Sequence, residues 1–242
     1  MEEKEYCQLF SDAFQLNGLS GLLTAERVNQ AVRFIDYLTE ENQKYNLTAI
    51  CDPISIVYKH FVDSLLASNL FSGNASVIDI GCGGGFPTVP LAIFRPDLHI
   101  TAIDSTEKKI RFIDAASRIA GFSVTAISGR AEVLATSDMR EKADIVTSRA
   151  VASLPILVEL CLPFVRLGGS LIAMKGPDLS RELKEAKNAI KILGGNIEDI
   201  QSASLRLPHG ATEQRNLLVI RKISSTPLQY PRAFRQIKKK HL

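Results

Sequence analysis

The hydrophobic residues of the first 72 positions recur at helical spacing. Between Thr24 and Gln43, apolar side chains return every three or four residues, and Thr24 is suited to cap the start of that helix. A shorter helix is predicted for Gln8–Leu16. A third begins at Asp52-Pro53, where the aspartate caps the helix and the proline fits its first turn. We therefore expect residues 1–72 to form an N-terminal helical region that packs on the sheet of the following segment.

After residue 75 the pattern changes to short apolar runs that alternate with amphipathic stretches. The short runs predict strands at Ser76–Ile80, Ile100–Ile103, Ser123–Ile127, Ile145–Thr147 and Ser170–Met174. The intervening stretches predict helices at Pro87–Phe94, Thr106–Ala120, Pro155–Val165 and Leu179–Leu193. Such alternation with short connections is typical of right-handed βαβ units on a parallel sheet.

Two more strands, near Asn196–Ile200 and Asn216–Arg221, have no helix between them. They are predicted to form an antiparallel pair at one edge of the sheet. The predicted fold is therefore α/β and Rossmann-like, with a mainly parallel seven-stranded sheet and helices on both faces. We assign this sheet to residues 73–222 and a basic C-terminal tail to residues 223–242.

The most informative motif follows the first predicted strand, where Gly81, Gly83 and Gly85 alternate and Asp79 precedes them. Glycines between a strand and a helix let the backbone approach a nucleotide-like ligand closely. A dinucleotide site requires a third glycine where this chain has Phe86, which argues against a nicotinamide-dependent oxidoreductase. The pattern favours a nucleoside without a pyrophosphate, and S-adenosylmethionine is the common ligand of that kind. A plain tight turn is the alternative interpretation.

The segments that follow five predicted strands carry glycine or polar residues. They are Gly81–Gly85, Asp104, Gly129–Glu132, Ser148-Arg149 and Lys175-Gly176. Because the carboxyl ends of parallel strands meet at one edge of a sheet, we expect these segments to converge on one ligand site. Asp104 is suited to bind ribose hydroxyls, with a favourable charge at the start of the next helix as the alternative.

Positive charge gathers at the C-terminus. Seven Lys or Arg and no acid lie from Arg221 onward, so the net charge of +3 leaves −4 for the preceding residues. A basic tail on a mildly acidic body indicates nucleic-acid binding, with a merely solubilising tail as the alternative. The candidate RNA-binding residues are Lys175 at the rim of the sheet and Arg232, Arg235, Lys238, Lys239 and Lys240 in the tail.

The cysteines do not indicate a metal centre. Cys7, Cys51, Cys82 and Cys161 are scattered without zinc-ligand spacing, so we expect reduced thiols, no metal and a cytoplasmic protein. The acidic N-terminus is unlike a secretory signal, and no apolar run reaches the ~18 residues of a membrane span. We expect a monomer.

Eight stretches in order along the chain resemble the glucose-inhibited division protein B family, the small-subunit ribosomal RNA methyltransferases G. They are Asn46–Ile50, His60–Leu65, Asp79–Leu91, Ile103–Ser105, Arg130–Glu132, Ser148–Val151, Lys175-Gly176 and Tyr230–Arg232. The resemblance covers almost the whole chain. Two features depart from the family pattern: Thr88 replaces a usual glycine, and the end of the chain lacks the usual proline before its last leucine.

The resemblance implies a class I methyltransferase that transfers a methyl group from S-adenosylmethionine to N7 of a guanine in 16S ribosomal RNA, in the loop near the decoding site. The expected partner is this RNA or the small ribosomal subunit. The resemblance implies cofactor contacts from Gly81, Phe86, Ala131, Glu132 and Arg149, with Asp104 at the ribose. Asp79, Gly83 and Gly85 complete the predicted cofactor site.

Methylation of guanine N7 needs no general base, because this nitrogen carries a free lone pair in the neutral base. Alignment of the reacting atoms and exclusion of water are the expected means of catalysis. Arg149 is therefore predicted to position the guanine O6 edge, an RNA phosphate or the cofactor carboxylate. Phe86 is predicted to cover the cofactor, stack on the base or pack in the core. His60 and Asp63 are predicted to join the helical region to the sheet.

Three other functions are compatible with parts of the sequence. A methyltransferase of the same fold acting on a small molecule or a protein is disfavoured by the basic tail and the family resemblance. The oxidoreductase is disfavoured by Phe86. A non-catalytic RNA-binding scaffold is disfavoured by the intact glycine loop and its acids.

Overall fold

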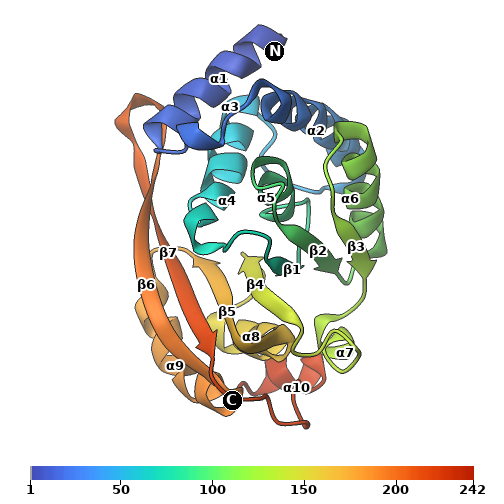
Figure 1. Ribbon diagram of the computed structural model, residues 1–242, viewed down its shortest axis with the longest axis vertical. Coiled ribbons are helices and arrows are strands. Elements are labelled where there is room, and N and C mark those ends of the chain that lie inside the picture. The colour runs from blue at the N-terminus through green and yellow to red at the C-terminus, as the bar shows by residue number, and fades with distance from the viewer. Residues whose placement is uncertain (1) are drawn as a thin grey trace.

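The computed structural model describes residues 2–242 and contains a seven-stranded sheet in the order β3-β2-β1-β4-β5-β7-β6 (Figure 1). The strands are β1 (Ser76–Ile80), β2 (His99–Asp104), β3 (Thr125–Ser128), β4 (Ala143–Arg149), β5 (Val165–Lys175), β6 (Gly195–Arg206) and β7 (Thr212–Lys222). Strands β1 to β5 pair in parallel, whereas β7 is antiparallel to both β5 and β6. The predicted parallel sheet with an antiparallel pair at one edge is confirmed.

Helices cover both faces of the sheet (Figure 1). Those before the first strand are α1 (Glu3–Leu16), α2 (Ala25–Tyr45), α3 (Pro53–Ile56) and α4 (Asp63–Leu65), the last two joined by a π-helical turn at Val57–Val62. The later ones are α5 (Thr88–Phe94), α6 (Glu107–Ala120), α7 (Ala131–Leu134), α8 (Leu154–Cys161), α9 (Leu179–Ile192) and α10 (Phe234–Lys239). Within residues 2–242, no helix combines the length and apolar character that crossing a bilayer requires.

The two faces of the sheet bury different sets of side chains, because successive residues of a strand point to opposite sides. On one face, Val77 and Ile100 lie in a core shared with α1, α2, α5 and α6. On the other face, Ile78 and Ile103 lie in a core shared with α8 and α9. The carboxyl ends of the parallel strands are thus held between two packed layers.

The predicted helix starts are confirmed by their capping hydrogen bonds. The Thr24 hydroxyl accepts from the backbone N–H of Arg27 at 3.3 Å, and the Asp52 carboxylate accepts from that of Ser55 at 2.7 Å. Each bond satisfies a backbone donor that the first turn of a helix leaves free.

The N-terminal helices share their core with the glycine-loop region. Phe10 of α1 is fully buried, and its ring centroid lies 5.4 Å from that of Phe61 and 6.1 Å from that of Phe94 in α5. Phe34 of α2 lies 5.8 Å from Phe86, at the end of the glycine loop. The N-terminal helical region therefore packs directly against the end of the glycine loop.

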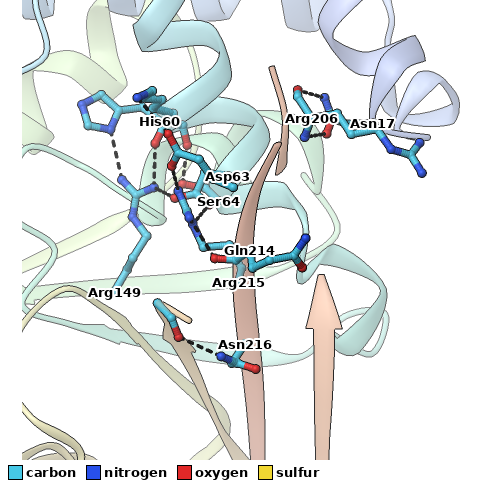
Figure 2. Close-up of polar contacts among 12 residues, drawn as sticks. Asn17, His60, Asp63, Ser64, Arg149, Arg206, Gln214, Arg215 and Asn216 are labelled. Atoms are coloured by element: carbon cyan, nitrogen blue, oxygen red, sulfur yellow. Dashed lines mark hydrogen bonds and ion pairs between the residues drawn. The ribbon is translucent and has the colours of Figure 1, made fainter. Parts of the chain in front are cut away.

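Strands β6 and β7 extend well beyond the predicted edge pair and reach α1. At the far end of β6, the backbone N–H of Arg206 donates to the Asn17 side chain at 2.8 Å, and the Asn17 amide donates back to the Arg206 carbonyl at 3.0 Å (Figure 2). The opposing residues 212–216 of β7 are all polar, so this half of the extension gives little strand signal in the sequence.

The sequence predicts no helix after residue 222, but the chain folds back there and forms α10. Ile237 is fully buried in the core beside α8. The Arg140 guanidinium donates to the backbone carbonyls of Thr226 at 2.7 Å and Tyr230 at 2.9 Å. The segment is therefore fixed to the body of the protein. Three consecutive lysines follow the one buried residue of α10, so the sequence shows no apolar periodicity there.

Candidate active site

A pocket of about 530 Å³ opens at the carboxyl ends of β1, β2 and β4. Its volume is within the range of small-molecule and cofactor sites. The predicted cofactor residues that line it are Gly81, Gly83, Phe86, Asp104, Ala131, Glu132 and Arg149. The structure thus brings together four of the five segments that were predicted to converge here. The fifth, Lys175-Gly176, lines a neighbouring hollow instead.

The glycine loop is shaped by close backbone contacts. The N–H groups of Gly81 and Cys82 donate to the Ile103 carbonyl at 2.8 and 3.1 Å, which ties the loop to β2. Gly81 has a φ of +74°, and a side chain there would collide with Val151. Gly83 also has a positive φ, and the nearest atom to a Cβ there would be 3.8 Å away. The loop therefore presents open backbone to the pocket at Gly83, which suits the close approach of a ligand.

Asp104 lies at the end of β2 with both carboxylate oxygens facing backbone donors. One oxygen accepts from the N–H of Gly83 at 3.1 Å and the other from that of Thr106 at 2.8 Å. A carboxylate has about four lone-pair sites, so two backbone bonds leave capacity for further donors. Lys109 lies 3.9 Å away and balances part of the charge. Asp104 can therefore bind ribose hydroxyls and, at the same time, accept a hydrogen bond at the start of α6.

Asp79 and Gly85 lie beneath the pocket and not in its lining. Asp79 is fully buried, and its Oδ2 accepts from the Thr88 hydroxyl at 2.6 Å. Its Oδ1 has no hydrogen-bond partner within the described residues, and burial raises the pKa of this carboxyl to about 6. A side chain at Gly85 would lie 2.7 Å from Val89 and 2.9 Å from Ile113, so this glycine permits helix packing. The predicted direct cofactor contacts from these two residues are therefore not seen, and both side-chain positions belong to the packing beneath the loop.

The far wall of the pocket is built from α7 and from the C-terminal segment. Ala131 and Glu132 begin α7, and the Glu132 carboxylate is paired with Arg130. The Arg130 guanidinium lies 4.8 Å from the ring centroid of Phe234, which also lines the pocket. Sequence reasoning missed Phe234, and only its position two residues after the family stretch that ends at Arg232 could have indicated it.

Arg149, at the end of β4, extends toward the N-terminal helical region (Figure 2). Its Nη1 donates to Asp63 Oδ2 at 2.9 Å and to the backbone carbonyl of Lys59 at 3.1 Å. The other Asp63 oxygen accepts from Arg215 of β7 at 2.7 Å. One carboxylate thus holds two arginines from different strands, and its negative charge offsets the positive charge of Arg149 at the pocket.

His60 completes this cluster as a neutral side chain. Its Nδ1 lies 3.2 Å from the Arg149 guanidinium, which can only donate, so Nδ1 accepts and the proton is on Nε2. Nε2 donates to the Thr48 hydroxyl at 2.7 Å. Burial, together with the charge of Arg149, lowers the pKa of His60 to about 3. The imidazole also stacks on Phe86, with the ring centroids 4.0 Å apart, and Phe86 is buried in the core while it lines the pocket.

The predicted RNA-binding residues are of two kinds. Lys175 is ion-paired with Glu182 at 2.6 Å, and Arg232 is paired through two nitrogens with the fully buried Glu159 at 2.8 and 2.6 Å. These two cations therefore have partners inside the protein. The other four predicted residues, Arg235, Lys238, Lys239 and Lys240, are exposed and make no ion pair with the described residues.

Within residues 2–242, no group of three or more His, Cys, Asp or Glu side chains has the arrangement of a metal site. Cys82 and Cys161 are buried, and burial raises the pKa of the Cys82 thiol well above its ordinary value. The pocket instead offers carboxylate acceptors for hydroxyl groups at Asp104, open backbone at Gly83 and the aromatic ring of Phe86. Such a pocket suits a nucleoside with a charged side arm.

Solved structures share this fold at low sequence identity. TYW2 from M. jannaschii, in complex with AdoMet, has a TM-score of 0.53 at 15% identity, over 67% of this chain and 75% of that chain. A putative methyltransferase from Bacillus halodurans has a TM-score of 0.50 at 17% identity, over 66% of this chain and 99% of that chain. The Rossmann-like α/β fold that the sequence predicts is thereby confirmed.

The sequence relatives are more specific. The family model GidB, rRNA small subunit methyltransferase G, matches residues 27–217. Ribosomal RNA small subunit methyltransferase G of Clostridium beijerinckii is 46% identical over 211 residues, which cover 84% of this chain and 87% of that protein. The protein of the same name from Acetivibrio thermocellus is 41% identical over 238 residues, 96% of each chain. The predicted family resemblance is confirmed, and the chain belongs to the rRNA small subunit methyltransferase G family.

Proposed function

We propose that the protein methylates N7 of a guanine in 16S ribosomal RNA and takes the methyl group from S-adenosylmethionine. The observation that carries this proposal is the pocket at the carboxyl ends of β1, β2 and β4, in a chain whose relatives are named ribosomal RNA small subunit methyltransferase G. The target loop near the decoding site follows from the family resemblance.

The residues of the pocket fit the cofactor. Asp104 has acceptor capacity for ribose hydroxyls, and the open backbone at Gly83 leaves room for the amino-acid arm. Ala131 and Glu132 line the side on which the adenine would lie. When bound, S-adenosylmethionine supplies a methyl group on a positively charged sulfur, which the chain's own residues must hold beside the incoming base.

The side chains around Arg149 suit a reaction without proton transfer. A neutral His60 with a pKa of about 3 is already hydrogen-bonded at both ring nitrogens, so it is not placed to accept a proton. The guanine gains positive charge at N7, and a bare cation nearby would oppose that gain. The Asp63 carboxylate offsets the Arg149 charge, so the guanidinium can orient a ligand at a smaller electrostatic penalty.

A division of labour along the chain accompanies this function. Residues 73–222 bind the cofactor, residues 1–72 support the glycine loop and Arg149 from below, and residues 223–242 close the pocket with Phe234 and present lysines to RNA. A substrate in the ribosome supports action in the cytoplasm.

Methyl transfer to purified RNA tests the function. The protein, labelled S-adenosylmethionine and either naked 16S RNA or small ribosomal subunits from cells that lack the enzyme are incubated, and the RNA is analysed by nuclease digestion and mass spectrometry. We expect 7-methylguanosine at a single position. Label in a protein or a small molecule, with none in RNA, would support the alternative methyltransferase of the same fold.

Replacing Arg149 tests its positioning role. Arg149→Ala is expected to lower the rate of methyl transfer at least about tenfold, about 1.4 kcal/mol in activation free energy, because the base or cofactor loses an orienting donor. Arg118→Ala, an exposed residue of α6, is the control and should retain the wild-type rate. Full activity of Arg149→Ala in single-turnover measurements would remove this residue from the mechanism.

A further inference from the structure

A second hollow, of about 390 Å³, lies directly beside the cofactor pocket. The two share His60, Arg149 and Ala150 in their linings, so they meet at these residues. The far side of the second hollow is formed by residues at the ends of β5 and β7 and in α9, among them Lys175, Glu182 and Arg215. A ligand in this hollow would adjoin the cofactor without competing for its place.

Most charged groups of the hollow are already engaged. Asp63 accepts from both Arg149 and Arg215. Arg215 also donates to Glu213 at 2.7 Å, and Lys59 pairs with the same carboxylate at 3.0 Å. These contacts hold the end of β7 against the N-terminal helical region (Figure 2). The walls of the hollow are therefore fixed before any ligand enters.

The Lys175–Glu182 pair is the exception, because it keeps one free donor and one free acceptor side by side. The Lys175 ammonium donates to Glu182 Oε2 at 2.6 Å and to the Ala152 carbonyl at 3.0 Å, which uses two of its three N–H groups. Oε2 also accepts from the backbone N–H of Leu154 at 2.6 Å. Within the described residues, no hydrogen bond reaches Glu182 Oε1, and this side chain is 28% exposed.

A free donor beside a free acceptor is complementary to guanine. Its Watson–Crick edge carries the O6 acceptor next to the N1–H and N2 amino donors, and unpaired RNA bases are commonly recognised through this edge. Adenine has an amino donor at the position of O6 and an acceptor at N1, so the same pair of side chains would oppose it. A lysine donor beside a glutamate acceptor therefore matches guanine and not adenine.

We propose that the second hollow is the binding site of the target guanine, with O6 facing the Lys175 ammonium and N1–H and the N2 amino group facing Glu182 Oε1. N7 is on the opposite side of O6 from N1, so recognition of this edge leaves the nucleophilic nitrogen uncovered. The inference rests on the proposed function and deepens it, because it names the residues that select the base. Lys175 then contacts the base and not an RNA phosphate.

Inosine is the discriminating substrate, since it keeps O6 and N1–H but lacks the N2 amino group. Small ribosomal subunits are reconstituted with 16S RNA that carries guanosine or inosine at the methylated position, and kcat/KM is measured for each. Wild-type protein is expected to favour guanosine about tenfold, a typical cost of an unmet hydrogen bond in a recognition site. Equal rates on the two substrates would overturn the proposal, whatever any variant does.

Glu182→Gln tests the carboxylate itself. The amide oxygen can still accept from Leu154 and Lys175, which leaves the amide N–H₂ group where guanine also presents donors. We expect kcat/KM for guanosine to fall at least about tenfold and the preference over inosine to disappear, because the two bases then differ by no favourable contact. Glu185→Gln, an exposed residue of the same helix, is the matched control and should change neither value more than about twofold.

Two further measurements on Glu182→Gln distinguish base recognition from a structural role. Affinity for S-adenosylmethionine should be unchanged in Glu182→Gln, and the variant should remain folded at the assay temperature. An equal loss of activity on guanosine and inosine, with the preference for guanosine retained, would contradict base recognition by Glu182. A wild-type protein that methylates neither RNA would refute the proposed function itself, which is a different outcome.

Discussion

At the scale of single residues, Asp63 is the side chain that joins two arginines near the site. It is 11% exposed and receives hydrogen bonds from Arg149 and Arg215, which come from strands on opposite sides of β5. Each arginine is largely buried, so removal of the shared carboxylate would leave two buried positive charges facing each other. Breaking a buried ion pair in this way is far more costly than losing an exposed one.

Asp63→Asn is therefore expected to lower the free energy of unfolding by about 3 kcal/mol. Asp114→Asn removes one partner of the exposed pair with Arg118 on α6 and should cost less than about 0.5 kcal/mol. Urea denaturation of the two variants and the wild type measures both values. Similar small losses in the two variants would show that Asp63 is not the anchor of the arginines.

Asp79 gives the protein a specific pH dependence. Its pKa in the folded protein is raised to about 6 by burial, against 3.8 ordinarily, although the hydrogen bond from Thr88 acts in the opposite direction. Between pH 4 and 6, the unfolded chain releases this proton while the folded protein retains it. The contribution of Asp79 to stability is therefore complete below pH 4 and is lost as the pH rises through 6.

Asp79→Asn cannot titrate, so its stability relative to the wild type should improve by about 3 kcal/mol or less between pH 4 and pH 7. Urea denaturation at several pH values measures the difference. The exposed Asp138→Asn controls for the loss of one surface charge. Parallel curves for wild type and Asp79→Asn across this window would contradict the buried, proton-retaining state.

At the scale of elements, α10 joins a buried anchor to a run of exposed lysines, for which we propose RNA binding. Ile237 is buried beside α8, and Arg232 just before the helix is paired with the buried Glu159. Lys238, Lys239 and Lys240 are exposed. The apolar and paired residues fix the helix beside the cofactor pocket, so the lysines have a defined position from which to attract RNA phosphates.

Replacing Lys238, Lys239 and Lys240 together by serine should weaken RNA binding and make it less dependent on salt. Loss of three phosphate contacts lowers the slope of log K against log salt concentration by about 2 for single-stranded RNA. The same replacement of Lys184, Lys187 and Lys191, exposed on α9, is the matched control. An unchanged slope in the α10 variant, by filter binding at several salt concentrations, would leave these lysines without a role in binding.

At the scale of the whole molecule, the N-terminal helices and the cofactor site depend on one continuous core. Phe10 and Phe14 of α1 pack against Phe94 of α5, which follows the glycine loop. Phe61 lies 6.1 Å from Phe86 at the pocket. A disturbance of α1 is therefore transmitted to the loop through buried aromatic contacts.

Phe10→Ala is accordingly expected to destabilise the protein by about 3 to 5 kcal/mol, the usual cost of such a cavity. The loss should affect the whole chain, so that the helical circular dichroism signal and cofactor binding disappear together on heating. The exposed Leu16→Ala, in the same helix, should have little effect. Loss of helical signal at a lower temperature than loss of cofactor binding would indicate a separable N-terminal unit.

Much of the fold was predictable because its signals are local. The spacing of apolar residues sets the strands and helices, Thr24 and Asp52 mark helix starts, and alternation of elements fixes a parallel sheet. The helix α10 was not predicted, since one buried isoleucine among three lysines gives no periodic pattern.

The sequence by itself determined the glycine loop and its acids, since Gly81, Gly83 and Asp104 depend on backbone geometry within one βαβ unit. Only the tertiary structure decided the partners of Arg149, the return of Phe234 to the pocket and the free oxygen of Glu182. These contacts join residues far apart in the chain. Their geometry depends on how the helices pack against the sheet, so it cannot be predicted from the spacing of residues along the sequence.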